Sequence, residues 1–214
     1  MAEILITLGI IGVVAALTIP NLIVKYQKQV VAARLKKTYS ILYSALNHSE
    51  SDNGNLQYPA MELWDKNTYY SGTEFSDKYI YPYLNIKKSK TLINSYGDKV
   101  VFLPDGTRIT YNAEIFQWPY NENAPLFLGK FKIEYKKEKE KSIAGKNYFQ
   151  FDWGYAQHGK SKLVLLPIYR TGDTVTKCSD DTIRTRCAEG QPSDCAKMII
   201  CNNWKVPDNY PIKF

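Results

Sequence analysis

The chain has 214 residues, of which 44% are hydrophobic and 23% are charged, and its formal net charge is +7. This length suffices for a long helix and one compact domain, so no second domain is needed. The basic excess lies near the N-terminus: residues 1–46 hold five basic side chains and one acidic, whereas the rest holds 23 basic and 20 acidic. The charge therefore does not require a nucleic-acid partner, and the basic stretch can meet lipid headgroups or acidic faces of neighbouring subunits.

Residues 4–24 form an apolar run without a formal charge. As a helix rising about 1.5 Å per residue, the run spans about 30 Å, the hydrocarbon thickness of a bilayer. A cleavable signal peptide has a basic start, a shorter apolar core and a small-residue cleavage site, and a soluble core helix has a polar face. The run has none of these features, so we predict a transmembrane or filament-core helix over residues 1–24.

The helical pattern continues after the charges begin. The apolar positions on one face fall at helical spacing: Val31, Leu35, Tyr39, Leu42 and Leu46. We predict one helix from Ala2 to about Asn47, whose amphipathic stem, residues 25–47, must lie on a folded partner. Pro20 lacks an amide N–H and clashes with the preceding turn, so a kink or local melting is expected there.

The N-terminal string "AEILITLGIIGVVAALTIP" places an acidic residue before an apolar span and a proline near its end, and a basic amphipathic stem follows. Over about the first 45 residues the chain resembles the N-terminus of type IV pilins and type II secretion pseudopilins. In that family a short basic leader ending in glycine is followed by the mature chain, which starts Phe-Thr-Leu. An acidic residue follows two residues after that leucine. Here Met1 stands in the place of that leucine. If the leucine codon serves as a start, we expect an in-frame basic stretch ending Gly-Phe-Thr upstream.

The resemblance implies an assembly role for Glu3 and Pro20. A carboxylate at membrane depth costs about 2.5–3.5 kcal/mol on insertion scales, and it is kept where a partner offsets that cost. In the family, the resemblance implies, the partner of this carboxylate is the N-terminal amine of a neighbouring subunit. The alternative is that Glu3 lies among headgroups at the cytoplasmic end, where it costs little. The resemblance also implies a single-pass inner-membrane protein with an extracytoplasmic head, and a prepilin peptidase and an assembly platform as partners.

Residues 48–214 are expected to form the head. Residues 48–97 are predicted as loop with a short helix around Thr73–Leu84, and "KVVFLPDGTRITYN" is typical of a hairpin that turns at Pro104–Gly106. Three more strand candidates follow: "LFLGKFKIEY", "KNYFQFDW" and "SKLVLLPIY". An antiparallel sheet packed on the stem would bury an apolar face of the sheet and one of the stem, so we predict an α+β fold. The resemblance implies the same arrangement, because the family's head is a long helix against a small antiparallel sheet. The intervening "KKEKEKSIAG" is interpreted as a solvated loop, because its mixed charges cancel.

All four cysteines lie close to the C-terminus: Cys178, Cys187, Cys195 and Cys201. An even, clustered set indicates disulfides in an oxidising compartment, and the spacings contain no C-x2-C knuckle of the kind that zinc sites use. "CAKMIICNNW" is expected to be a short helix with its two cysteines on different faces, so each pairs upstream. Both the nested and the crossed pairing remain open, with a slight preference for the nested one. Either pairing staples a polar C-terminal loop.

No catalytic, cofactor or metal site is predicted. Neither His48 nor His158 has a serine, cysteine or acid at a catalytic spacing, and no glycine-rich phosphate loop occurs. The acids near the cysteines could hold a calcium ion, but their spacing does not match an EF-hand loop, so they are interpreted as solvated loop acids: Asp173, Asp180, Asp181 and Asp194.

Three functions follow from these observations. The first is a structural subunit of a type IV filament or type II secretion pseudopilus, which forms homo- or hetero-oligomers and is held in inner-membrane lipid before assembly. The second is a membrane-anchored binding module, such as a minor tip pilin for adhesion or DNA uptake. The third is an anchored enzyme. A stripe of basic and aromatic side chains on one head face would favour DNA capture, and a deep pocket with convergent titratable groups would favour an enzyme.

Overall fold

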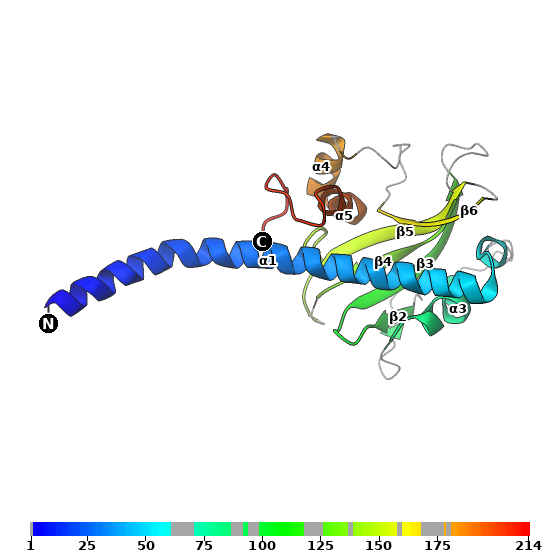
Figure 1. Ribbon diagram of the computed structural model, residues 1–214, viewed down its shortest axis with the longest axis horizontal. Helices are drawn as coiled ribbons and strands as arrows, with labels where there is room; N and C mark the ends of the chain where they lie inside the picture. The colour runs from blue at the N-terminus through cyan, green and yellow to red at the C-terminus, as the bar shows by residue number, and fades with distance from the viewer. Residues whose placement is uncertain are drawn as a thin grey trace.

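Helix α1 (Ala2–Asn53) is the longest element of the computed structural model, and its N-terminal half extends away from the folded head (Figure 1). The structure describes residues 2–60, 71–86, 92–93, 99–117, 126–136, 139–157, 160–167, 178 and 181–214. α1 remains helical through Pro20, so no local melting occurs there. The helix instead curves between its apolar and amphipathic halves (Figure 1). A proline removes one backbone hydrogen bond, and the helix can bend at that point without breaking.

The C-terminal end of α1 lies beyond the boundary expected from the sequence. We expected the stem to end near Asn47, but the helix continues to Asn53. The head holds this extension, because the Tyr155 hydroxyl donates a hydrogen bond to Glu50 Oε1 at 2.7 Å. Gly54 then ends the helix with a φ of 77°, a left-handed conformation that glycine adopts without a Cβ clash. The expected boundary was wrong because a long-range contact outweighs the local preference of these residues for turns.

In the described part of the chain, six antiparallel strands form one sheet in which each strand pairs with the next along the chain. They are β1 (Leu92–Ile93), β2 (Lys99–Phe102), β3 (Arg108–Gln117), β4 (Leu126–Glu134), β5 (Tyr148–Gln157) and β6 (Lys160–Leu166). The predicted hairpin is confirmed as β2 and β3, and Gly106 in its turn has a φ of 82°. The three later strand candidates correspond to β4, β5 and β6. The α+β layout is therefore confirmed: a long N-terminal apolar helix, a small antiparallel sheet and two disulfides.

The sheet buries one face against the helices and leaves charged side chains on the other. Buried residues on the helix-facing side include Val101, Ile109, Tyr111, Phe131, Ile133, Phe149, Phe151, Trp153, Leu163 and Leu165. The stem buries Leu35 and Leu42 in the same core, and its Tyr39 ring lies 5.5 Å from the ring of Phe151. On the opposite face Arg108 stands directly across from Glu134. The opposite face is mixed, because it also holds the buried residues Val100, Phe102 and Asp152.

A short helix beside the stem also packs on the helix-facing side of the sheet. The sequence predicts one helix around Thr73–Leu84, and the structure has α3 (Ser71–Tyr79) followed by the 3-10 turn η1 (Tyr81–Tyr83). Phe75 of α3 is buried, and its ring lies 5.8 Å from that of Tyr111 and 5.7 Å from that of Trp153. The helix is thus anchored on the central strands by aromatic packing.

The C-terminal region is more regular than the stapled loop expected from the sequence. It contains two helices, α4 (Asp181–Ala188) and α5 (Pro192–Cys201), of which only the second was predicted. Helix α4 buries Ile183 and Cys187, four residues apart on one face, and α5 buries Ile199 in the main core. The expectation of a loop was wrong for α4. Its apolar face is too short to predict a helix alone, and the helix is stabilised by the disulfide of Cys187 and by packing against α5.

Tyr155 connects the sheet to the end of α1, and its removal should destabilise the head. The Tyr155 hydroxyl donates to Glu50 and accepts the Leu56 N–H at 2.9 Å. Tyr155→Phe leaves both partners unsatisfied, which should cost about 1–3 kcal/mol and lower the Tm by several degrees. Thermal unfolding of the detergent-solubilised chain measures this shift, with Tyr58→Phe as the control because Tyr58 is 72% exposed. Equal Tm values for the two variants would contradict the role of this hydroxyl.

The turn between β2 and β3 is held to the stem by a carboxylate whose contribution depends on pH. Lys37 Nζ lies 3.0 Å from Asp105 Oδ2, and the Thr107 N–H donates to Asp105 Oδ1 at 3.0 Å. Burial alone raises the pKa of Asp105, but the Thr107 hydrogen bonds and Lys37 outweigh it and lower the pKa from 3.8 to about 2. The stabilisation is therefore present above pH 3.8 and is lost as the pH falls through about 2.

Asp105→Asn should lower the Tm slightly near neutral pH, because the contact is partly exposed and screened by solvent. The difference between wild type and variant should shrink towards zero as the pH falls from about 4 to about 2, where the native carboxylate also becomes protonated. Thermal unfolding over a pH series checks this. A difference that stays constant with pH would show that charge on Asp105 plays no part.

Candidate functional site

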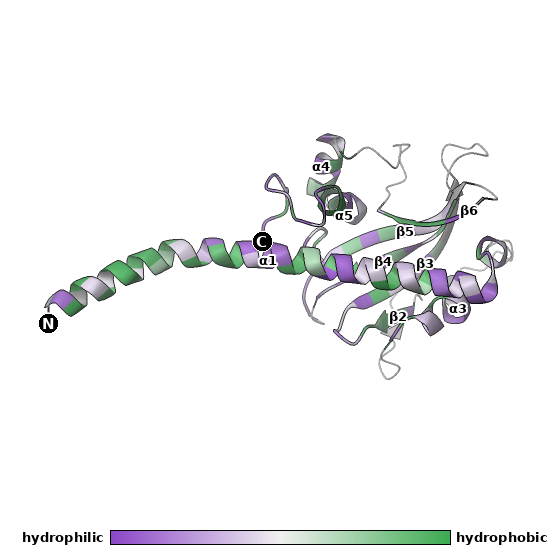
Figure 2. Ribbon diagram, viewed as in Figure 1, coloured by the Kyte–Doolittle hydropathy of each residue, from purple (hydrophilic) through white to green (hydrophobic). Residues whose placement is uncertain are grey.

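The N-terminal half of α1 is mostly apolar in sequence and extends away from the head (Figure 2), and most of the exposed large apolar side chains of the described residues lie on it. Large apolar side chains are exposed along the whole run from Ile4 to Val24; Leu17, for example, is 70% exposed. This is the one helix among the described residues that is long and apolar enough to cross a membrane. Apolar exposure on this scale marks a surface that meets lipid or another protein.

The threonine hydroxyls in this half form their hydrogen bonds within the helix itself. Thr7 Oγ1 donates to the carbonyl oxygens of Glu3 and Ile4 at 3.1 and 2.9 Å, and Thr18 Oγ1 donates to the Val14 carbonyl at 2.9 Å. Hydroxyls bonded to the backbone in this way need no water. The helix surface can therefore leave water without orphaning these hydroxyls.

Glu3 lies in the first turn of α1, where the helix dipole favours a negative charge. It is exposed at the end of the helix that points away from the head (Figure 1). Among the described residues no cation forms an ion pair with its carboxylate. Pro20 lies near the other end of the apolar half, also exposed, so the two predicted assembly residues are separated along one helix.

Small side chains lie between these two residues. Gly9 and Gly12 have no atom within 4 Å of the place that a Cβ would take. Together with Ala16 they fall at spacings of three and four, on one side of the helix. Small residues at this spacing allow the backbones of two helices to approach closely.

The four cysteines form two nested disulfides. Cys178 pairs with Cys201 across 23 residues, and Cys187 pairs with Cys195 across eight. The inner pair is buried between α4 and α5, whereas Cys178 is exposed. The outer bridge thus ties the end of α5 to the segment that precedes α4.

The predicted acids and histidines do not come together as a chemical site. Asp194 is buried and forms a bidentate pair with Arg186, with Nε and Nη2 each 3.1 Å from a carboxylate oxygen. His48 is exposed on α1, and Asp181 is exposed at the start of α4. The other acids and histidine singled out from the sequence lie outside the described residues: Asp173, Asp180 and His158. In the described part of the chain no three His, Cys, Asp or Glu side chains are placed to hold a metal ion.

A groove of about 490 Å³ runs beside the outer disulfide. Its lining includes Asp181, Arg184, Lys197 and Met198. Arg184 Nε donates to the Asn209 carbonyl at 3.1 Å, which holds the C-terminal segment against α4. The groove was not predicted from the sequence because the segment of α4 was expected to be loop. The apolar pair Ile183 and Cys187 at helical spacing was the available signal.

The chain belongs to a protein family of unknown function, DUF6613, whose model matches residues 21–214. The matched region begins directly after Pro20 and so covers the amphipathic stem and the whole head. No match was found among curated proteins or among solved structures.

The two disulfides should differ in how readily they are reduced. Cys178 is exposed, whereas Cys187 and Cys195 are buried, so a mild reductant should open the outer bridge first. Alkylation of the native chain followed by mass spectrometry measures the order. Simultaneous reduction of both bridges, or reduction of the inner bridge first, would contradict the different burial of the two pairs.

Proposed function

We propose that this chain is a structural subunit of pilin or pseudopilin type, which is anchored in the membrane by α1 and assembles through the same helix. The proposal rests on one observation: a continuous helix has its C-terminal half packed in a folded head and its apolar N-terminal half exposed. A helix that is apolar all round needs a nonaqueous environment on every side. Lipid provides it for a single subunit, and the helices of other subunits provide it in a filament.

Two features of the apolar half favour helix–helix assembly over a simple anchor. The stripe of Gly9, Gly12 and Ala16 allows a partner helix to approach closely. A simple anchor surrounded by lipid gains nothing from such small residues. Glu3 carries a charge that an apolar environment penalises unless a cation is supplied. The amine of a neighbouring subunit is such a cation, and its pairing with Glu3 would set the register of the added subunit.

A structural role also agrees better with the described head than catalysis does. In the described head the buried carboxylate of Asp194 is held by Arg186 in a bidentate ion pair that joins α4 to α5, which is a structural use of both charges. We therefore infer that the protein is not an enzyme.

A second candidate is a membrane-anchored binding module, such as a minor subunit at a filament tip. The groove beside the outer disulfide favours it, because Arg184 and Lys197 line the groove together with apolar and amide side chains. The composition of sheared filaments separates the two candidates. A structural subunit should be their main component, whereas a tip subunit should be present in far smaller amount than another subunit.

Glu3→Ala tests the proposed assembly directly. In the host, expressed from its native locus, the variant should insert and fold normally but should reach sheared filaments poorly. Removing one partner of a desolvated ion pair costs about 3–5 kcal/mol, although relief from burying the charge offsets a part of this. The ratio of sheared to membrane-extracted protein should thus fall at least about tenfold, the factor that corresponds to 1.4 kcal/mol.

Glu189→Ala is the matched control, since Glu189 is exposed on the head at the end of α4. It should leave the ratio unchanged. If Glu3→Ala also leaves the ratio unchanged while filaments form, Glu3 does not register subunits. If wild type yields no sheared protein under any condition, the chain is an anchored head and not a filament subunit.

A further inference from the structure

Outside α1, the described head exposes only two large apolar side chains, those of Tyr58 and Ile143. Ile143 is 40% exposed and lies in the connection between β4 and β5. We call residues 139–147 the Ile143 loop. The exposed part of this aliphatic side chain gains nothing from burial in the head, and contact with an apolar partner would remove it from water.

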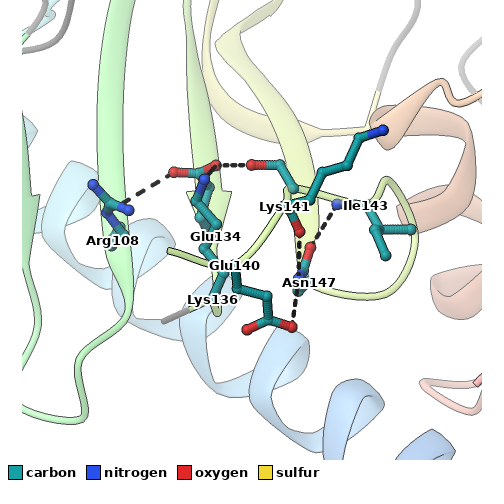
Figure 3. A network of polar contacts seen from close by, with 8 residues as sticks. Arg108, Glu134, Lys136, Glu140, Lys141, Ile143 and Asn147 are labelled. Atoms are coloured by element: carbon teal, nitrogen blue, oxygen red, sulfur yellow. Dashed lines mark hydrogen bonds and ion pairs between the residues drawn. The ribbon is translucent and has the colours of Figure 1, made fainter. Parts of the chain in front are cut away.

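The Ile143 loop is held in one conformation by Asn147 (Figure 3). The Asn147 Oδ1 accepts the Ile143 N–H at 2.6 Å, and its Nδ2 donates to Glu140 Oε1 at 3.2 Å and to the Lys141 carbonyl at 3.1 Å. Ser142 is bonded to Glu134 at the end of β4. These bonds brace the loop on both sides of Ile143, so the partly exposed Ile143 side chain is held in a defined position.

Cationic residues flank Ile143 on both sides in the sequence of the loop. Lys139 and Lys141 are exposed, and Lys146 is half-buried against the C-terminal segment, where its Nζ lies 5.8 Å from the centre of the Phe214 ring. Glu140 is the only acid of the loop, and it accepts the bond from Asn147. An exposed apolar side chain within a basic loop combines the two forces that hold proteins at an anionic lipid surface.

The loop lies where α1 enters the head. The Tyr135 N–H bonds to the Asn147 carbonyl at 2.8 Å, and the Tyr135 hydroxyl donates to Thr38 Oγ1 of the stem at 3.0 Å. The Arg34 guanidinium lies 4.6 Å from the centre of the Tyr135 ring. These contacts place the loop beside the first turns of α1 that the head covers.

The end of the apolar span is close to this point. The first buried residue of α1 is Ala32, eight positions after Val24, which corresponds to about 12 Å of helix. The headgroup region extends about 5–7 Å beyond the hydrocarbon core on each side. The covered part of α1 thus begins about 5–7 Å from the headgroups, which is within the Debye length of about 8 Å at physiological ionic strength. If residues 4–24 span the bilayer, the Ile143 loop is therefore within electrostatic reach of the headgroups.

We propose that the Ile143 loop docks on anionic phospholipid headgroups of the membrane that α1 spans, with Ile143 inserted at the lipid interface. This inference rests on the proposed membrane anchoring of α1. Docking at this second point fixes the tilt and height of the head above the bilayer, and the unassembled subunit is thereby oriented for addition to a filament.

The test uses the full chain, one copy per nanodisc, in discs of phosphatidylcholine alone or of an equal mixture with phosphatidylglycerol. A membrane-impermeant acetylating reagent labels exposed lysines, and mass spectrometry gives the rate at each site. Lys139 and Lys141 should react about fivefold more slowly in the anionic discs, and high salt should remove most of this protection. Lys78, which is exposed on α3 at the far end of the head, serves as the internal control and should react equally in both discs.

Ile143→Ser should reduce the protection without changing any charge, whereas Tyr58→Ser, the matched change at the other exposed apolar residue, should leave it intact. Equal labelling of the loop in both lipids, or full protection in Ile143→Ser, would overturn the inference while leaving the anchoring proposal in place. A chain that is not retained in discs of either composition would refute the anchoring itself, and the inference with it.

Discussion

One helix in two environments is the constraint on which the rest of this structure depends. From Ala32 onward α1 buries a face in the core of the head, whereas large apolar side chains between Ile4 and Val24 are exposed. Because the helix is continuous, the head cannot move independently of the apolar half. Whatever binds residues 4–24 therefore also positions the head, and this mechanical coupling is what a filament subunit needs.

The head is arranged to hold the stem at several points along its length. Lys37 reaches the turn between β2 and β3, Tyr39 packs on Phe151 in the middle of the sheet, and Glu50 bonds to Tyr155 at its far end. The central contact is apolar and the two outer ones are polar. Apolar packing supplies most of the stability, whereas the polar contacts fix the position of the helix along the sheet.

The sequence predicts the parts of this fold that depend on local pattern. The alternation around Phe149 and Phe151, the turn at Gly106 and the uninterrupted apolar run before Lys25 each follow from neighbouring residues, and the corresponding strand, hairpin and helix are present. Glu3 and Pro20 were singled out by resemblance to a family motif, and their predicted role concerns other molecules.

Features that depend on distant partners were missed or misplaced. The last turns of α1 need Tyr155, about 100 residues away, and α4 needs a disulfide and α5 to complete its core. The exposure of Ile143 was not predicted, because the mixed-charge stretch "KKEKEKSIAG" was interpreted as an ordinary solvated loop. In each case the deciding contact lies across the fold, where neither propensity nor periodicity carries information.

The contacts of Leu17 in living cells test the central claim most directly. A photo-crosslinking amino acid at this exposed position of α1 should form adducts with lipid in the membrane fraction and with other subunits in sheared filaments. The same substitution at Tyr58, exposed on the head, should give no adduct with lipid. Filaments that contain the chain but show no adduct between subunits at Leu17 would contradict assembly through the N-terminal helix.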